Sequence, residues 1–188
     1  MTVAVLFARA DSIYKTIPGC DVYDIERDAL SWSGGCPVIA HPPCRAWDQL
    51  SHFAKPRPGE KELAVWAVAQ VRKWGGVLEH PRSSRLWPTV GLPMGEAVDE
   101  LGGFTLSVDQ FWWGHRARKR TFLYCAGLRR VDLPTMPIVL GEAPCTVHSG
   151  TPTGKPPRNN APEISHVERE QTPPALARWL VELASRIK

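Results

Sequence analysis

A strand–helix–strand pattern in the first half of the chain limits the possible folds most strongly. Apolar segments at 37–40 and 77–79 flank the stretch 60–74, whose apolar residues recur at helical spacing. Those residues are Leu63, Trp66, Ala67, Val71 and Trp74. A helix between two such strands is a crossover that makes them parallel, so both strands end at the same edge of one sheet. The pattern predicts an α/β fold, in which ligands bind at that edge.

The same reasoning predicts the other strands and the fold class. Further strands are expected near 3–8, 21–24, 104–110 and 121–126. The last two are expected to form an antiparallel hairpin on an otherwise mostly parallel sheet. Together with helices on both faces, they predict a three-layer α/β fold with a single domain over residues 1–188.

Two further helices and one loop are expected. The segment 172–188 is predicted to be a helix that Thr172 caps and Pro173 begins. Its apolar stripe consists of Leu176, Leu180, Leu183 and Ile187. A short helix is expected from Gly95 to Leu101, and the Pro/Gly/Asn-rich stretch 150–162 is expected to be a mobile loop.

Composition excludes several classes of protein. The chain has 188 residues, of which 43% are apolar and 22% charged, values that exclude wholesale disorder and a coiled coil. No run approaches the ~18 apolar residues of a membrane span, so no membrane partner is expected. Five cysteines without a CxxC pair favour a reducing compartment, and residues 1–15 are interpreted as a strand rather than a signal peptide. A cytoplasmic location is therefore expected.

Chemically useful side chains follow both strands of the crossover unit. Cys44 ends the sequence HPPC at 41–44, and Glu79 begins EHP at 79–81. A cysteine on a rigid Pro-Pro turn beside basic residues is a candidate nucleophile whose thiolate is favoured, and a neighbouring carboxylate is a candidate acid or base. A buried structural cysteine, and a glutamate paired with Arg82 or Arg85, are the alternatives.

Two other clusters leave alternatives open. The segment RARKR at 116–120 is either a solvated basic edge or a contact for phosphate or a base. Alternation along an extended chain places Arg118 and Arg120 on one face and Lys119 on the other. A metal site is a further alternative, with possible ligands Cys36, His41, Cys44 and His80, or the pair Cys145 and His148. Zinc sites usually show tighter paired spacings, so no metal is expected.

Three motifs in this order resemble those of the DNA cytosine-C5 methyltransferases. PPC at 42–44 is similar to their nucleophile motif, EHP at 79–81 to their Glu-Asn-Val/Pro motif, and RARKRTFL at 116–123 to their Gln-x-Arg-x-Arg segment and the following strand. The resemblance implies that Cys44 adds to C6 of cytosine and that Glu79 binds the N3 and amine side. It also implies that Arg118 and Arg120 support the ring. Further contacts to the base or substrate are assigned to Pro43, His41, His80 and Arg116.

The resemblance also implies a Rossmann-like fold and S-adenosylmethionine as cofactor. Its site is expected at the first two strand ends, with Phe7, Asp11, Asp24 and Glu26 as binding residues. The turn FARAD at 7–11 lacks the family's glycines, and the interval from Phe7 to Cys44 is shorter than in the family. A truncated cofactor half is therefore expected.

The implied partner is DNA or a pyrimidine nucleotide. No separate recognition domain fits between residue 127 and the last helix, so target recognition would involve a partner protein. Compact chains of this kind resemble phage and prophage reading frames, which implies the cytoplasm of a bacterial host. Two alternatives remain: a pyrimidine nucleotide-modifying enzyme with a different cofactor, and an inactive relative that only binds nucleic acid.

Overall fold

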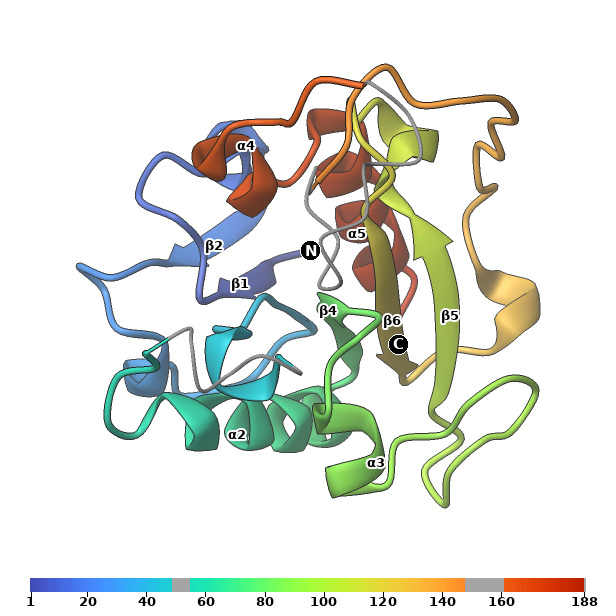
Figure 1. The fold of residues 1–188 in the computed structure, drawn as a ribbon. Helices are drawn as coiled ribbons and strands as arrows, with labels where there is room; N and C mark the ends of the chain where they lie inside the picture. Colours follow the sequence, from blue (N-terminus) through green and yellow to red (C-terminus); the bar gives the residue numbers. More distant parts are fainter. Residues whose placement is uncertain (49–54, 148–160, 188) are drawn as a thin grey trace.

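A six-stranded mixed sheet forms the centre of the described chain, which comprises residues 1–48, 55–147 and 161–187 of a computed structural model (Figure 1). The strands are β1 (Val3–Leu6), β2 (Cys20–Tyr23), β3 (Val38–Ala40), β4 (Gly76–Pro81), β5 (Phe104–Asp109) and β6 (Arg120–Ala126). Their order in the sheet is β2-β1-β3-β4-β6-β5. The first four are mutually parallel, whereas β6 pairs antiparallel with both β4 and β5. The predicted α/β class and antiparallel hairpin are confirmed.

Two helices cover the two faces of the sheet (Figure 1). Helix α2 (Glu60–Trp74) packs on one face and α5 (Pro174–Ser185) on the other. Successive residues of a strand point to opposite faces, so each central strand contributes to both cores. The residues facing α2 include Leu6, Ala40 and Leu78, and those facing α5 include Val5, Ile39 and Val77.

Short helices connect these layers. Two are α-helical, α3 (Leu86–Val90) and α4 (His166–Glu170). The 3-10 turns are η1 (Ile13–Thr16), η2 (Ala29–Ser31), η3 (Arg45–Trp47), η4 (Gln110–Trp113) and η5 (Arg130–Asp132). Within the described ranges, every helix is too short or too polar to cross a membrane.

The two long helices occupy the predicted segments with small differences. The buried face of α2 centres on Ala64, Ala67 and Val68, so Trp66 and Trp74 lie at its margins. All four residues of the predicted stripe of α5 are buried. The prediction for Thr172 is wrong, because Pro173 occupies the cap position and no side chain caps this helix.

The predicted helix from Gly95 to Leu101 is also wrong. This segment is a turn, because the Asp99 carboxylate accepts hydrogen bonds from the amides of Leu101 (3.1 Å) and Gly103 (2.8 Å). The Tyr124 hydroxyl donates to the same carboxylate at 2.5 Å. An aspartate that takes backbone amides in this way competes with helix formation. The predicted loop at 150–162 lies almost entirely outside the described residues.

The tight contact between β3 and β4 gives a test of the sheet. Gly76 has φ +139°, and a Cβ there would lie 2.0 Å from the carbonyl oxygen of Val38. We expect Gly76→Ala to lower the free energy of unfolding by at least about 3 kcal/mol. Gly91 also has positive φ (+65°) but faces open space, so Gly91→Ala should cost only ~1 kcal/mol. Equal costs in urea unfolding would show that β3 and β4 are not packed this closely.

Candidate active site

The carboxyl ends of β3 and β4 meet at one edge of the sheet, as the crossover pattern predicts. The two strands are adjacent and parallel, with Ala40 opposite Leu78. Cys44 follows β3 and is half-buried, and Glu79 lies one residue beyond that last pair in β4. The Glu79 carboxylate raises the pKa of the Cys44 thiol, so the two groups are within electrostatic reach. The prediction that Cys44 and Glu79 lie at the carboxyl ends of adjacent parallel strands is confirmed.

Glu79 is a nearly buried carboxylate held by donors from two other segments. His41 Nδ1 lies 3.0 Å from Oε2, and Gln110 Nε2 donates to Oε1 at 3.1 Å. Burial alone raises the pKa of Glu79, but the hydrogen bond from His41 and the positive charge of Lys119 outweigh it and lower that pKa to about 2. Glu79 is therefore a carboxylate at neutral pH and acts as a hydrogen-bond acceptor.

Cys44 is a protonated thiol in the resting protein. Burial is the main cause that raises its pKa, and the charge of Glu79 adds to it, whereas Lys119 lowers it. The expectation that the basic segment favours a thiolate is therefore wrong, because burial and the charge of Glu79 outweigh the charge of Lys119. A base must remove the thiol proton before the sulfur becomes a strong nucleophile.

Lys119 is the member of the basic segment that faces this edge. In the antiparallel register, Glu79 lies opposite Leu123, so Thr121 and Lys119 continue on the face of the sheet that carries Glu79. The charge of Lys119 lowers the pKa of both Glu79 and Cys44, which agrees with that position. The predicted alternation along this segment thus brings the lysine, rather than its arginine neighbours, to the carboxylate.

Two of the three arginines of the segment pair with other carboxylates. Arg116 forms an ion pair with Glu168 of α4 (2.6 Å). Arg118 pairs with Asp109 (3.0 Å), and its guanidinium lies over the Phe111 ring at 4.8 Å. Arg120 is exposed and pairs with no carboxylate in the described part of the chain. The structure therefore does not bring these arginines together with Glu79.

Gln110 is a site residue that the sequence motifs did not reveal. Its Nε2 donates to Glu79 Oε1 and to Thr121 Oγ1, both at 3.1 Å. Thr121 donates its own proton to the Lys119 carbonyl, so both neighbours of the amide nitrogen are acceptors and the amide orientation is fixed. Gln110 Oε1 is then a buried acceptor without a donor among the residues described. Gln110 directly follows β5 at a strand end beside β6, and this position is the feature from which its place in the site could have been predicted.

His80 lies beside this site rather than within it, and Pro43 directly precedes Cys44 in the HPPC turn. His80 alternates with Glu79, so its ring points to the other face of β4 and packs near Trp87 with 6.3 Å between centroids. It is fully buried, and burial lowers its pKa to about 4. Among the described residues, its ring nitrogens have no hydrogen-bond partner of good geometry, although one lies near the Pro43 backbone. His80 is therefore a neutral packing residue under the HPPC turn.

The acidic residue expected to hold a ribose is already paired. Asp24 is buried at the end of β2, where Oδ1 accepts hydrogen bonds from the amides of Glu26 (3.0 Å) and Arg27 (3.2 Å). Its Oδ2 lies 2.6 Å from Lys15 Nζ. Both carboxylate oxygens thus stabilise the loop after β2. Glu26 is exposed at the same loop.

The turn after β1 is also occupied by the protein's own side chains. Phe7 has φ +60°, a conformation costly for a bulky residue, and its ring packs edge-on against Trp66 with 5.9 Å between centroids. Asp11 forms an ion pair with Arg9 at 2.8 Å. A ligand such as S-adenosylmethionine needs free backbone and a free carboxylate here, so the residues as arranged do not fit it.

The described residues contain no cluster of three or more His, Cys, Asp or Glu side chains suited to a metal ion. The alternative set of Cys36, His41, Cys44 and His80 is therefore not gathered in one place. His148 lies outside the described residues. His41 is instead hydrogen-bonded to Glu79.

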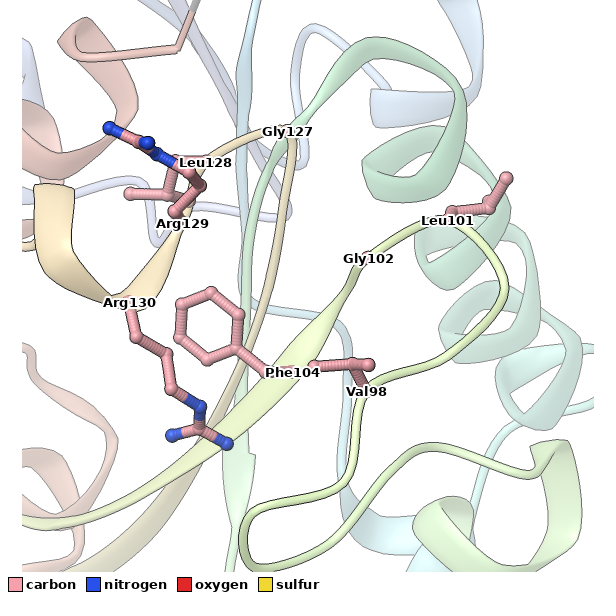
Figure 2. Close-up of a pocket in the computed structure, with 8 residues that line it drawn as sticks. All are labelled: Val98, Leu101, Gly102, Phe104, Gly127, Leu128, Arg129 and Arg130. Atoms are coloured by element: carbon pink, nitrogen blue, oxygen red, sulfur yellow. The ribbon is translucent and has the colours of Figure 1, made fainter.

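A hollow of about 390 Å³ lies at the opposite edge of the sheet, where β5 begins and β6 ends (Figure 2). Figure 2 shows Phe104 between Arg130 and the Val98–Gly102 turn. The Arg130 guanidinium lies 4.5 Å from the centre of the Phe104 ring and donates to the Gly95 carbonyl (2.7 Å). Arg129 pairs with Asp132. Because both cations already have partners, the strand edge at Cys44 is the stronger candidate.

No protein-family model matches the chain, and no curated protein matches its sequence. The chemistry of the site therefore rests on the residues themselves.

The charges around Cys44 predict its reactivity. Replacing Glu79 with Gln removes the negative charge that raises the thiol pKa, so iodoacetamide should label Cys44 roughly three- to tenfold faster at pH 8. Lys119→Met should slow labelling, because it removes the charge that lowers this pKa. The exposed Lys73→Met is the matched control. Unchanged rates in both site variants would contradict the proximity of these groups.

The turn after β1 predicts weak cofactor binding. Titration calorimetry of the free protein with S-adenosylmethionine should give no saturable heat at affinities tighter than about 100 μM. The physical reason is that Asp24 and Asp11 would have to give up Lys15 and Arg9 before they bound a ligand. Tight binding would show that this turn forms a complete pocket with other contacts.

Proposed function

We propose that the protein modifies a pyrimidine base of DNA through a covalent bond between the Cys44 sulfur and C6 of the ring, as a cytosine-C5 methyltransferase-like enzyme. The observation that carries the proposal is the meeting of Cys44 and Glu79 at the carboxyl ends of β3 and β4. A thiol and a carboxylate are the two groups that nucleophilic addition to such a ring requires. The order of the three motifs along an α/β sheet supports a Rossmann-like, methyltransferase-type fold with a shortened cofactor half.

The protonation states suggest how the addition is balanced. The Cys44 thiol gives its proton to the Glu79 carboxylate, and the sulfur bonds to C6 of the ring. The C5–C6 double bond opens, its electrons move through C5 and C4 toward N3, and N3 takes the proton from Glu79. No net proton is gained or lost, and C5 becomes a nucleophilic enamine carbon. The base has to leave the helical stack to reach the thiol.

Two further groups suit this reaction. Lys119 supplies a positive charge near both reacting groups, where negative charge moves from sulfur to the ring. Gln110 donates its amide N–H to Glu79 Oε1 and so holds the carboxylate in place. These groups replace the pair of arginines that the resemblance implies.

A related enzyme that acts on free pyrimidine nucleotides, with another co-reactant, is the second candidate. The observation that favours it is the pairing of Asp24 with Lys15 and of Asp11 with Arg9, so that neither of the carboxylates expected to bind S-adenosylmethionine is free. Both candidates share the Cys44 adduct. They differ in whether the reactive base belongs to a DNA strand.

Exchange of the cytosine C5 hydrogen tests the adduct without any cofactor. Addition at C6 makes C5 take up a solvent proton, and elimination then releases either hydrogen, so deuterium from heavy water should enter C5. We expect exchange with DNA, none with Cys44→Ser, and normal exchange with the control Cys36→Ser. Exchange only with free nucleotides would favour the second candidate. Absence of exchange from duplex, single-stranded and nucleotide substrates would overturn the proposal.

Lys119 and its neighbour Arg120 give a matched pair of variants. Lys119→Met should lower the exchange rate by at least about tenfold, because it removes a charge close to the reacting groups. Arg120→Met should change the saturated rate less than about threefold, since this side chain is exposed. Rates measured at saturating DNA separate this effect from loss of binding. A larger loss in Arg120→Met would favour the arginine assignment that the motif implies.

A further inference from the structure

A buried hydrogen-bond chain runs from Tyr14 through His41 to Glu79. His41 Nδ1 lies 3.0 Å from Glu79 Oε2, and His41 Nε2 lies 3.0 Å from the Tyr14 hydroxyl oxygen. Tyr14 is 1% exposed, and the side chains of His41 and Glu79 are each 12% exposed. Tyr14 belongs to η1, His41 follows β3 and Glu79 lies in β4, so three separate segments build the chain.

The donors and acceptors give this chain a direction. An ionised carboxylate only accepts, so His41 Nδ1 carries a hydrogen and donates it to Glu79. In the neutral imidazole, Nε2 is then the acceptor, and it takes the hydroxyl proton of Tyr14. Burial and the charge of Glu79 keep the pKa of Tyr14 well above its usual value, so the hydroxyl stays a donor. Each member therefore donates toward Glu79.

This direction matters because the carboxylate is in an environment that disfavours its charge. Burial alone raises the pKa of Glu79, and the hydrogen bond from His41 is the largest cause that lowers it. The hydrogen bond from His41 therefore keeps Glu79 ionised to lower pH and fixes the orientation of its Oε2. The tautomer of His41 that donates to Glu79 is the one that the Tyr14 hydroxyl favours.

We propose that Tyr14 and His41 are positioning residues that fix the orientation of the Glu79 carboxylate as the proton acceptor for the Cys44 thiol. The proposal rests on the proposed function for the identity of the reaction, but not for the state of the carboxylate. Neither residue touches the reacting atoms in this scheme. Both act through Glu79.

Other titratable or charged groups lie around this hydrogen-bond chain and affect its pH dependence. The titratable or charged groups around Glu79 and Tyr14 are His41, Cys44, Lys119, His80 and Cys20. His80 gains charge only below about pH 4, its lowered pKa, so it does not contribute near neutrality. Lys119 also favours the ionised form of Glu79, so removal of His41 alone should weaken but not abolish that preference.

Two measurements test the proposal together. One is the pKa of Glu79, and the other is the acid limb of the pH profile of C5 hydrogen exchange, the range in which the rate falls as the pH is lowered. Carbon-13 NMR of protein labelled at glutamate carboxyl carbons gives the titration, with the Glu79 signal assigned by its absence in Glu79→Gln. In His41→Leu, we expect the pKa of Glu79 to rise from about 2 by at least ~2 units, and the acid limb to move equally. Tyr14→Phe should give a smaller rise. His41→Asn, which can place an amide N–H near the position of Nδ1, should partly restore the wild-type value.

The controls separate positioning from packing and from the proposed function. His166→Gln changes an exposed histidine and should leave both readouts unchanged. A purely structural role for His41 would lower the rate equally at every pH and leave the carboxyl titration unmoved, which would overturn the proposal. If His41→Leu does not fold, Tyr14→Phe and His41→Asn carry the same test. A shifted titration without exchange in any protein would overturn the proposed function alone.

Discussion

The charge of Glu79 is the constraint on which the rest of the candidate site depends. A carboxylate removed from water needs donors that replace its hydration, and a buried charge without them is costly. Here the donors come from His41 after β3 and Gln110 after β5, and Lys119 before β6 adds a positive charge. The sheet order β3-β4-β6-β5 is what brings these segments around the end of β4. The same charge raises the pKa of the Cys44 thiol, so the proposed nucleophile and its proposed base are electrostatically coupled.

The antiparallel pairing of β6 with β4 determines which cation lies near the Glu79 carboxylate. Side chains alternate along a strand, and the pairing of Glu79 with Leu123 assigns every second residue of 119–123 to the face of Glu79. A shift of the pairing by one residue would exchange Lys119 for Arg118 and Arg120. Lysine presents a compact charge and arginine a planar fork, so this cation supports Glu79 electrostatically and offers no bidentate group.

Much of the fold was predictable because it depends on local pattern. The crossover unit of 37–79 and the stripe of α5 follow from apolar spacing, and the meeting of Cys44 with Glu79 follows from the rule that parallel strands end together. The turn at Asp99 was not predictable, because the Tyr124 hydroxyl that helps hold it comes from a distant strand. The short helices α3 and α4 carry too few residues for a periodic signal.

The site itself was predictable only in part. Cys44 and Glu79 stand in motifs, whereas Gln110 and Tyr14 join them through strand order and the η1 turn, which no local pattern specifies. The assignment of the supporting cation needed the register of β6, and the state of Cys44 needed its burial. The order of the motifs therefore predicted which edge of the sheet carries the site. The pairing of distant strands determined which other side chains lie at that edge.

Covalent capture of a pyrimidine tests the central claim most directly. DNA that contains 5-azacytosine has a more electrophilic C6 and no carbon at position 5 where the reaction can be completed. Intact-mass spectrometry should show a protein–DNA adduct, and peptide mapping should place it on Cys44. Loss of the adduct in Cys44→Ser and its persistence in Cys36→Ser are also expected. An adduct on another residue, or none with any strand tested, would contradict the assignment of Cys44 as the nucleophile.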